Sequence, residues 1–161
     1  MKYYVDLTGE NGCVGILFTQ PENTAVYTGT TVHTEEAKLR DHPLAERFAR
    51  ECDFHFFFQG DNLPKLYTVP QTEIGGYDSR GGLFAGSYNF TIRDAEPLYY
   101  IDREGKCWLV TSDSSKFLEM GMSWREKMVE SDAIEAFASR AEAERKYRIW
   151  EWKELLKEGD L

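Results

Sequence analysis

The sequence is poor in the side chains that most enzymes use for nucleophilic and metal chemistry. It has three histidines and three cysteines, namely His33, His42, His55, Cys13, Cys52 and Cys107. No CxxC or HxxxH pair occurs, although such local spacing is the usual way to assemble a zinc site. The cysteines are odd in number and widely spaced, which argues against a disulfide framework. We therefore expect buried thiols, no metal and no cofactor.

Motifs for phosphate binding and nucleophilic catalysis are also missing. The glycine-rich segment 73–82 contains neither GxxxxGK[ST] nor GxGxxG. A nucleophile needs a base beside a serine or cysteine, with an orienting group behind that base. Each histidine lies outside such a motif: one at a strand end, one before a proline and one in an aromatic run. The sequence thus predicts no catalytic residue, and an enzyme using Asp, Glu or Tyr in an unfamiliar arrangement is left as an alternative.

Long hydrophobic runs are absent. The longest apolar stretches, 54–58 and 98–101, are far shorter than the roughly 20 residues that a membrane-spanning helix needs. The first residues reach an acid at Asp6, whereas a secretory signal has a basic start and an uninterrupted apolar segment. These features predict a cytoplasmic protein with no membrane segment.

Positive charge is scarce relative to negative charge. The formal net charge is −9 and the isoelectric point is near 4.9. A negative field repels phosphate backbones and anionic lipids, so a basic protein partner is favoured over nucleic acid. The 161 residues, 42% of them apolar, suffice for one hydrophobic core. We expect a single α+β domain spanning residues 1–161.

Local patterns predict several strands. Residues 3–7 and 14–18 alternate apolar and polar side chains around a turn, which predicts an N-terminal hairpin. A third strand is expected at 25–32, because β-branched residues are frequent there. The aromatic run 54–58 predicts a buried strand near the centre of the sheet. The clearest hairpin joins 98–101 to 107–110, where Gly105 can take the positive φ that such a turn needs.

Other patterns predict helices. Thr34 precedes two acids and suits a helix N-terminus, and His42 or Asp41 can cap a further helix with Pro43 in its first turn. From Asp132 onward, apolar residues recur at helical spacing as far as Leu156, which predicts a long C-terminal helix. The expected fold class is α+β: a central, mostly antiparallel β-sheet with surrounding helices and that long C-terminal helix.

A few residues are candidates for contact with a protein partner. Glycines flank Tyr77, Asp78 and Arg80, a composition found both at recognition loops and at ordinary solvated turns. On the predicted last helix, Trp150 either faces a partner or covers the domain's own sheet. The full set of candidates is Tyr77, Asp78, Arg80, Tyr88, Asp94, Glu96 and Trp150.

The middle of the chain resembles a known family. The segments that carry the likeness are Leu63-Pro64-Lys65-Leu66-Tyr67, Gly81-Gly82-Leu83-Phe84-Ala85, Pro97-Leu98-Tyr99-Tyr100-Ile101-Asp102 and the serine-led stretch 112–118. In this order they are similar to the SUKH superfamily. The resemblance implies an α+β fold with a central antiparallel sheet. It also implies the role of many bacterial members, which are immunity proteins that bind and neutralise toxin domains, often nucleases or deaminases.

The sequence therefore predicts a non-catalytic, immunity-type binding protein whose partner is a basic toxin domain. The alternative is a regulatory or small-ligand-binding module, with the glycine-rich turns and the 54–58 strand lining a pocket.

Overall fold

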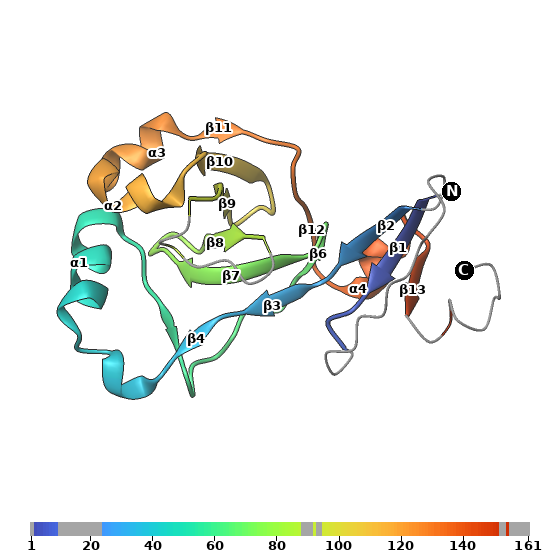
Figure 1. Ribbon diagram of the computed structural model, residues 1–161, viewed down its shortest axis with the longest axis horizontal. Helices are drawn as coiled ribbons and strands as arrows, with labels where there is room; N and C mark the ends of the chain where they lie inside the picture. The colour runs from blue at the N-terminus through green and yellow to red at the C-terminus, as the bar shows by residue number, and fades with distance from the viewer. Residues whose placement is uncertain (1, 10–23, 88–91, 93–94, 152–153, 155–161) are drawn as a thin grey trace.

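The structure is a computed structural model that describes residues 2–9, 24–87, 92, 95–151 and 154. A larger body is built around a six-stranded sheet, and a smaller body of strands lies at one end of it (Figure 1). Strand β3 runs from the smaller body into the larger one, and β6 and β12 lie between the two (Figure 1). Several separate segments of the chain therefore connect the two bodies to each other.

The six-stranded sheet has the order β11-β10-β9-β8-β7-β3, and only its β3–β7 pair is parallel. Its strands are β3 (Thr30–Val32), β7 (Thr72–Tyr77), β8 (Leu83–Gly86), β9 (Leu98–Ile101), β10 (Cys107–Thr111) and β11 (Val129–Glu130). The predicted β9–β10 hairpin is confirmed, and Gly105 in its turn has a φ of +88°. A side chain at this φ would be strained, so glycine suits the position.

Helices and 3-10 turns cover one end of this sheet. They are a 3-10 turn at Ala37–Leu39, α1 (Pro43–Cys52), 3-10 turns at Ser114–Lys116 and Gly121–Ser123, α2 (Phe117–Met120) and α3 (Trp124–Lys127). The predicted start of α1 is confirmed: Pro43 occupies its first turn, and Nδ1 of His42 accepts a hydrogen bond from the Leu44 N–H. The main core lies between these helices and the sheet, where Phe54, Phe84, Leu98, Phe117 and Trp124 are fully buried.

The aromatic run 54–58 forms much less strand than predicted. Only β5 (Phe57–Phe58) is regular, and it pairs with β4 (Thr34–Glu35) in a separate two-stranded sheet. The prediction of a central strand was wrong because Phe54 instead packs its ring inward against the core. The helix predicted to begin at Thr34 was also wrong, since that residue extends into β4 and only the short turn Ala37–Leu39 follows.

The smaller body contains a three-stranded parallel sheet of order β13-β1-β2. Its elements are β1 (Lys2–Asp6), β2 (Thr24–Thr28), α4 (Arg140–Ala143) and β13 (Ile149–Glu151), and beside it β6 (Tyr67–Val69) pairs with β12 (Glu135–Phe137). The strand predicted at 25–32 is split at Gly29, which has a φ of +110° and separates β2 from β3. The second arm of the predicted N-terminal hairpin lies outside the described residues.

The predicted fold class is wrong, because the described residues 132–151 form no long C-terminal helix. The chain from Asp132 to Glu151 forms strand β12, the single-turn helix α4 and strand β13. Ser139 caps α4, and Phe137 pairs with Tyr67 of β6. The described part of the protein is a mixed α/β structure composed mostly of strands. No helix in the described ranges is long and apolar enough to cross a membrane.

Candidate functional site

A histidine, an acid and a hydroxyl meet at the end of α1. Asp53 follows this helix in the left-handed conformation, with φ +53°. Its Oδ1 lies 2.8 Å from His55 Nε2, and its Oδ2 accepts a 2.6 Å hydrogen bond from the Ser79 hydroxyl. These three residue types also make up a catalytic triad, so the order of their contacts decides what they can do.

The order of contacts does not activate Ser79. In a triad the histidine lies between the acid and the nucleophile, whereas here Asp53 lies between His55 and Ser79. Burial raises the pKa of Asp53, but hydrogen bonds from Ser79, His55 and Arg125 outweigh it and lower that pKa to about 2. A carboxylate with so low a pKa is a weak base at neutral pH. The cluster therefore fixes the loop geometry and does not form a nucleophile with its base.

The arginine that reaches Asp53 also holds a second, fully buried carboxylate. Arg125 Nη2 lies 2.6 Å from Asp53 Oδ2 and 3.0 Å from Asp78 Oδ2. Asp78 also accepts hydrogen bonds from the Tyr100 hydroxyl and from the backbone N–H groups of Arg80 and Gly82. With its side chain 0% exposed, Asp78 faces the interior. It was a candidate for partner contact, but its carboxylate instead supports the turn between β7 and β8.

Tyr77, the residue before Asp78, presents its aromatic ring at the surface and forms a ridge there. His55 and Tyr77 exchange backbone hydrogen bonds of 2.8 and 2.9 Å, so their side chains lie next to each other. The His55 ring stacks on the Tyr77 ring at 5.2 Å between centroids, and Phe57 packs on it at 4.8 Å. Tyr77 remains 36% exposed. Its ring is thus both accessible and held in place by two neighbours.

A hollow lies on each side of this ridge, and Tyr77 lines both. The first has a volume of about 400 Å³ and is bordered by the exposed Leu63 and by Asp61. The second, of about 490 Å³, is bordered by Asp41 and Glu46. We call Tyr77, Leu63, Arg80 and the lining of these two hollows the Tyr77 surface.

The remaining sequence-based candidates are scattered. Arg80 is exposed in the turn next to Tyr77. Glu96 is also exposed, and it accepts a 2.5 Å hydrogen bond from the Ser87 hydroxyl. Trp150 lies half-buried in β13, not on a helix, with the Arg148 guanidinium over its ring at 4.1 Å. Tyr88 and Asp94 lie outside the described residues.

Sequence reasoning missed most residues of the Tyr77 surface, among them Leu63 and His55. Leu63 was read only as part of the family-like LPxxY segment, yet it is 44% exposed and borders a hollow. His55 was read as an interior residue of an aromatic strand, yet it stacks on Tyr77. The turn signal Gly60-Asp61-Asn62 just before Leu63 was the one available hint that this leucine lies at the surface.

The described residues offer little for metal or thiol chemistry. They contain no group of three or more His, Cys, Asp or Glu side chains placed to hold a metal ion. Burial raises the pKa of the Cys52 thiol to about 11 and that of the Cys107 thiol to about 11. Both thiols are therefore protonated at neutral pH and poorly nucleophilic.

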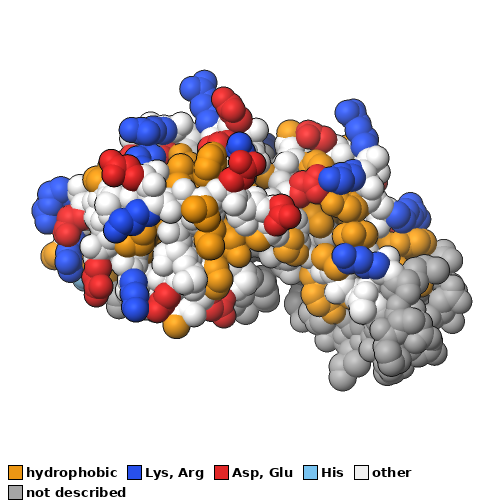
Figure 2. Space-filling model, turned by 90° about the horizontal axis from the view of Figure 1, so that it is seen from above, with side chains coloured by type: hydrophobic (Ala, Val, Ile, Leu, Met, Phe, Trp, Pro, Cys, Tyr) orange, Lys and Arg blue, Asp and Glu red, His pale blue; other side chains and the backbone are white. Residues whose placement is uncertain are grey.

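Charges of both signs are interspersed on the face above β10 and β11, and hydrophobic side chains gather between them (Figure 2). Val129 of the edge strand β11 is 57% exposed. This face shows no block of one sign, so the negative excess of the chain is not concentrated there.

Comparison with family models, with curated proteins and with solved structures found no match. The functional argument therefore depends on the residues and geometry described above.

Proposed function

We propose that this chain is a non-catalytic binding protein of the immunity type, similar to SUKH proteins, which neutralises a basic toxin domain by holding it on the Tyr77 surface. The single observation that carries this proposal is the rigid, exposed Tyr77 ring between two hollows. Tyrosine is among the residues that most often dominate binding energy at protein interfaces.

The packing of Tyr77 makes it a good anchor. Ordering a mobile side chain on binding costs about 0.5–1.5 kcal/mol, and a ring already held between His55 and Phe57 avoids most of that cost. The flanking hollows offer space for protruding partner side chains. Leu63 supplies further apolar contact area beside the ridge.

The charge of the chain suits a cationic partner. The border of the Tyr77 surface mixes the carboxylates of Asp41, Glu46 and Asp61 with two arginines, Arg40 and Arg80. The attraction therefore comes from the overall net charge of −9, which speeds encounter with a basic protein. Under this proposal, association slows as salt is raised.

Two further observations support a binding role in the cytoplasm. Asp53 accepts a hydrogen bond from the Ser79 hydroxyl with a carboxylate that is a poor base, so that cluster offers no activated nucleophile. The buried, free thiols of Cys52 and Cys107 suit a reducing compartment. Cytoplasmic location remains part of the proposal.

The test is co-expression with the protein encoded by the adjacent gene, followed by measured affinity and cell survival. Tyr77→Ala is expected to weaken the complex by at least about 30-fold, because anchors of this kind contribute about 2 kcal/mol or more. Val129→Ala removes a still more exposed apolar side chain from β11, outside the Tyr77 surface, and is expected to leave affinity unchanged.

Melting temperatures of both variants check that each remains folded. Unchanged affinity and protection in a folded Tyr77→Ala protein would exclude the Tyr77 surface. A neighbour that neither binds the chain nor harms cells would exclude the immunity role.

A further inference from the structure

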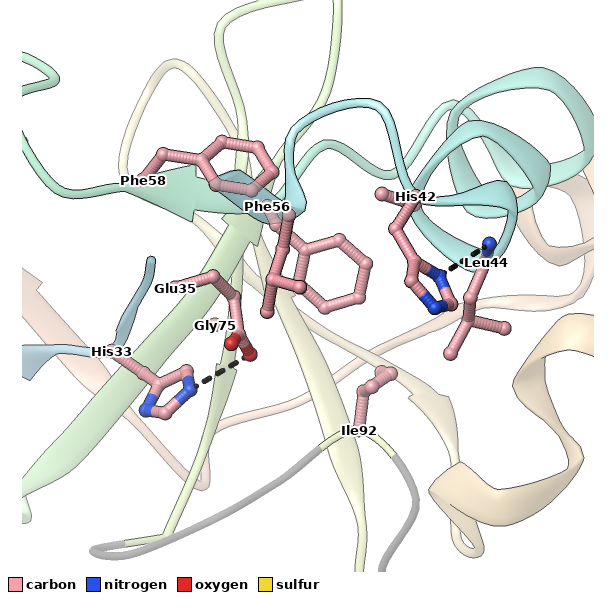
Figure 3. A pocket seen from close by; sticks show the side chains of 10 residues that line it. His33, Glu35, His42, Leu44, Phe56, Phe58, Gly75 and Ile92 are labelled. Atoms are coloured by element: carbon pink, nitrogen blue, oxygen red, sulfur yellow. Dashed lines mark hydrogen bonds and ion pairs between the residues drawn. The ribbon is translucent and has the colours of Figure 1, made fainter. Parts of the chain in front are cut away.

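A third cavity, of about 310 Å³, lies between β4, β5 and the start of α1, and it shares Ala45, Phe56 and Phe58 with the lining of the second hollow. It is lined by His33, Glu35, Leu39, His42, Leu44, Ala45, Phe56, Phe58, Gly75 and Ile92 (Figure 3). Its volume falls at the small end of the range of about 300–1,000 Å³ that is typical of small-molecule sites. The sequence suggested, as an alternative function, a small-ligand pocket lined by the 54–58 segment and the glycine-rich turns. Phe56, Phe58 and Gly75 come from these segments and line this cavity, which favours a small-ligand site in this protein.

The walls of this cavity are mainly apolar. The Phe56 ring lies in the middle of the view, with Leu44 and Ile92 on the side of α1 (Figure 3). Phe56 is fixed by edge-on contacts with Phe48 and Phe54, at 5.3 and 5.0 Å between centroids. A ligand entering here meets a preformed aromatic surface and needs an apolar body.

One end of the cavity carries the carboxylate of Glu35, with the His33 ring beside it. Glu35 Oε1 lies 3.0 Å from His33 Nε2, and its Oε2 has no hydrogen-bond partner within the described ranges (Figure 3). A neutral His33 donates its N–H to Glu35 without cancelling the carboxylate charge. The ten lining residues include no lysine or arginine.

The other end carries a hydrogen-bond donor. Nδ1 of His42 accepts a hydrogen bond from the Leu44 N–H, so in a neutral ring the proton is on Nε2. His42 and Glu35 stand on opposite sides of Phe56 (Figure 3). The cavity thus offers an acceptor at one end, an apolar middle and a donor at the other.

We propose that this cavity binds a small amphiphilic amine, with its ammonium group at Glu35 and its apolar body against Phe56. An ammonium group donates three hydrogen bonds, which suits the unpaired Oε2 of Glu35. The aromatic wall adds a modest attraction for a cation at this partly solvated end of the cavity. This site does not depend on the proposed toxin partner, which is assigned to the Tyr77 surface.

The experiment compares three probes with the same apolar body and different charge: phenethylamine, phenethyl alcohol and phenylacetate. Each is titrated into the isotopically labelled protein and followed by backbone NMR. We expect phenethylamine to bind with a dissociation constant on the order of millimolar, as is usual for a fragment of this size. The alcohol is expected to bind about fivefold more weakly, and phenylacetate more weakly still.

Variants locate the site and test the role of charge. Glu35→Gln is expected to abolish the preference for the amine over the alcohol, a change of about fivefold for one partly solvated ion pair. Glu36→Gln is the matched control, because Glu36 is the neighbouring acid, pairs with Lys38 at 3.0 Å and does not line the cavity. Ala45→Leu narrows the cavity from α1 and is expected to weaken all three probes.

Several results would overturn the proposal. One is equal binding of amine and alcohol by the unaltered protein. Another is that the Glu35→Gln variant still binds the amine more tightly than the alcohol. A third is that none of the amide signals of residues 33–35, 44–45 and 75 shifts on titration. Loss of toxin neutralisation by Tyr77→Ala has no bearing on these outcomes, so the two proposals fail separately.

Discussion

Replacing Arg125 by methionine should unfold the protein at markedly lower denaturant. Methionine keeps most of the aliphatic volume and packing against Trp124, whose ring lies 4.5 Å from the guanidinium carbon. It removes the cation that joins Asp53 to Asp78. The Asp78 carboxylate, whose side chain is 0% exposed, would then lie in the interior without its cationic partner.

The structure sets the size of this effect. Removing one partner of a buried ion pair costs about 3–5 kcal/mol, because the other charge is left uncompensated. Asp78 keeps its hydrogen bonds from Tyr100, Arg80 and Gly82, so we expect the lower value, about 3 kcal/mol. With a urea dependence of about 2 kcal/mol per molar, the unfolding midpoint should fall by about 1.5 M.

Equilibrium urea unfolding followed by tryptophan fluorescence measures this shift. Arg80→Met is the matched control, because Arg80 is exposed and its side chain makes no ion pair with the described residues. Its midpoint should move by less than about 0.3 M. If Arg125→Met behaved like Arg80→Met, the inference that this arginine neutralises a buried carboxylate would be wrong.

Two further predictions concern the same region. The pKa of Asp53 is lowered from 3.8 to about 2 in the folded protein, so its carboxylate contributes about 2 kcal/mol of stability that is present above pH 4 and lost as the pH falls through 2. In acid-unfolding curves, Asp53→Asn should therefore reduce the dependence of the unfolding free energy on pH between 4 and 2. Gly82→Ala should destabilise the protein by about 2–3 kcal/mol, because its Cβ would collide with the Tyr100 hydroxyl that donates to Asp78. Gly9→Ala, whose Cβ would meet no atom of the described residues within 4 Å, is the control by thermal melting, and equal effects of the two would contradict the predicted collision.

The sequence predicted elements whose signals are local. The β9–β10 hairpin followed from two apolar stretches and Gly105, and the start of α1 followed from His42 and Pro43. In both, the residues that specify the structure are neighbours in the chain. Tyr77 and Arg80 were predicted to lie on a glycine-flanked turn; both are exposed, and Arg80 lies in the turn, but Tyr77 is the last residue of β7.

Elements that depend on distant partners were not predictable in this way. The segment after Asp132 has helical spacing of apolar residues, but β12 pairs with β6 and β13 pairs with β1, and this pairing overrides the local preference. Asp78 looked like a surface acid because the groups that bury and neutralise it, Tyr100 and Arg125, come from remote positions. Similarly, the cavity beside Phe56 forms only when β4, β5 and α1 come together.

The position of β1 between β2 and β13 has a consequence for biosynthesis. Tyr4 pairs with Val26 on one side and with Ile149 on the other, so β1 gains its second neighbour only after translation has passed through the whole larger body to β13. The hairpins of the larger body, in contrast, pair soon after they are translated. Until β13 is translated, one edge of β1 lacks the partner that covers it in the folded protein, and an unpaired strand edge is prone to pair with another chain.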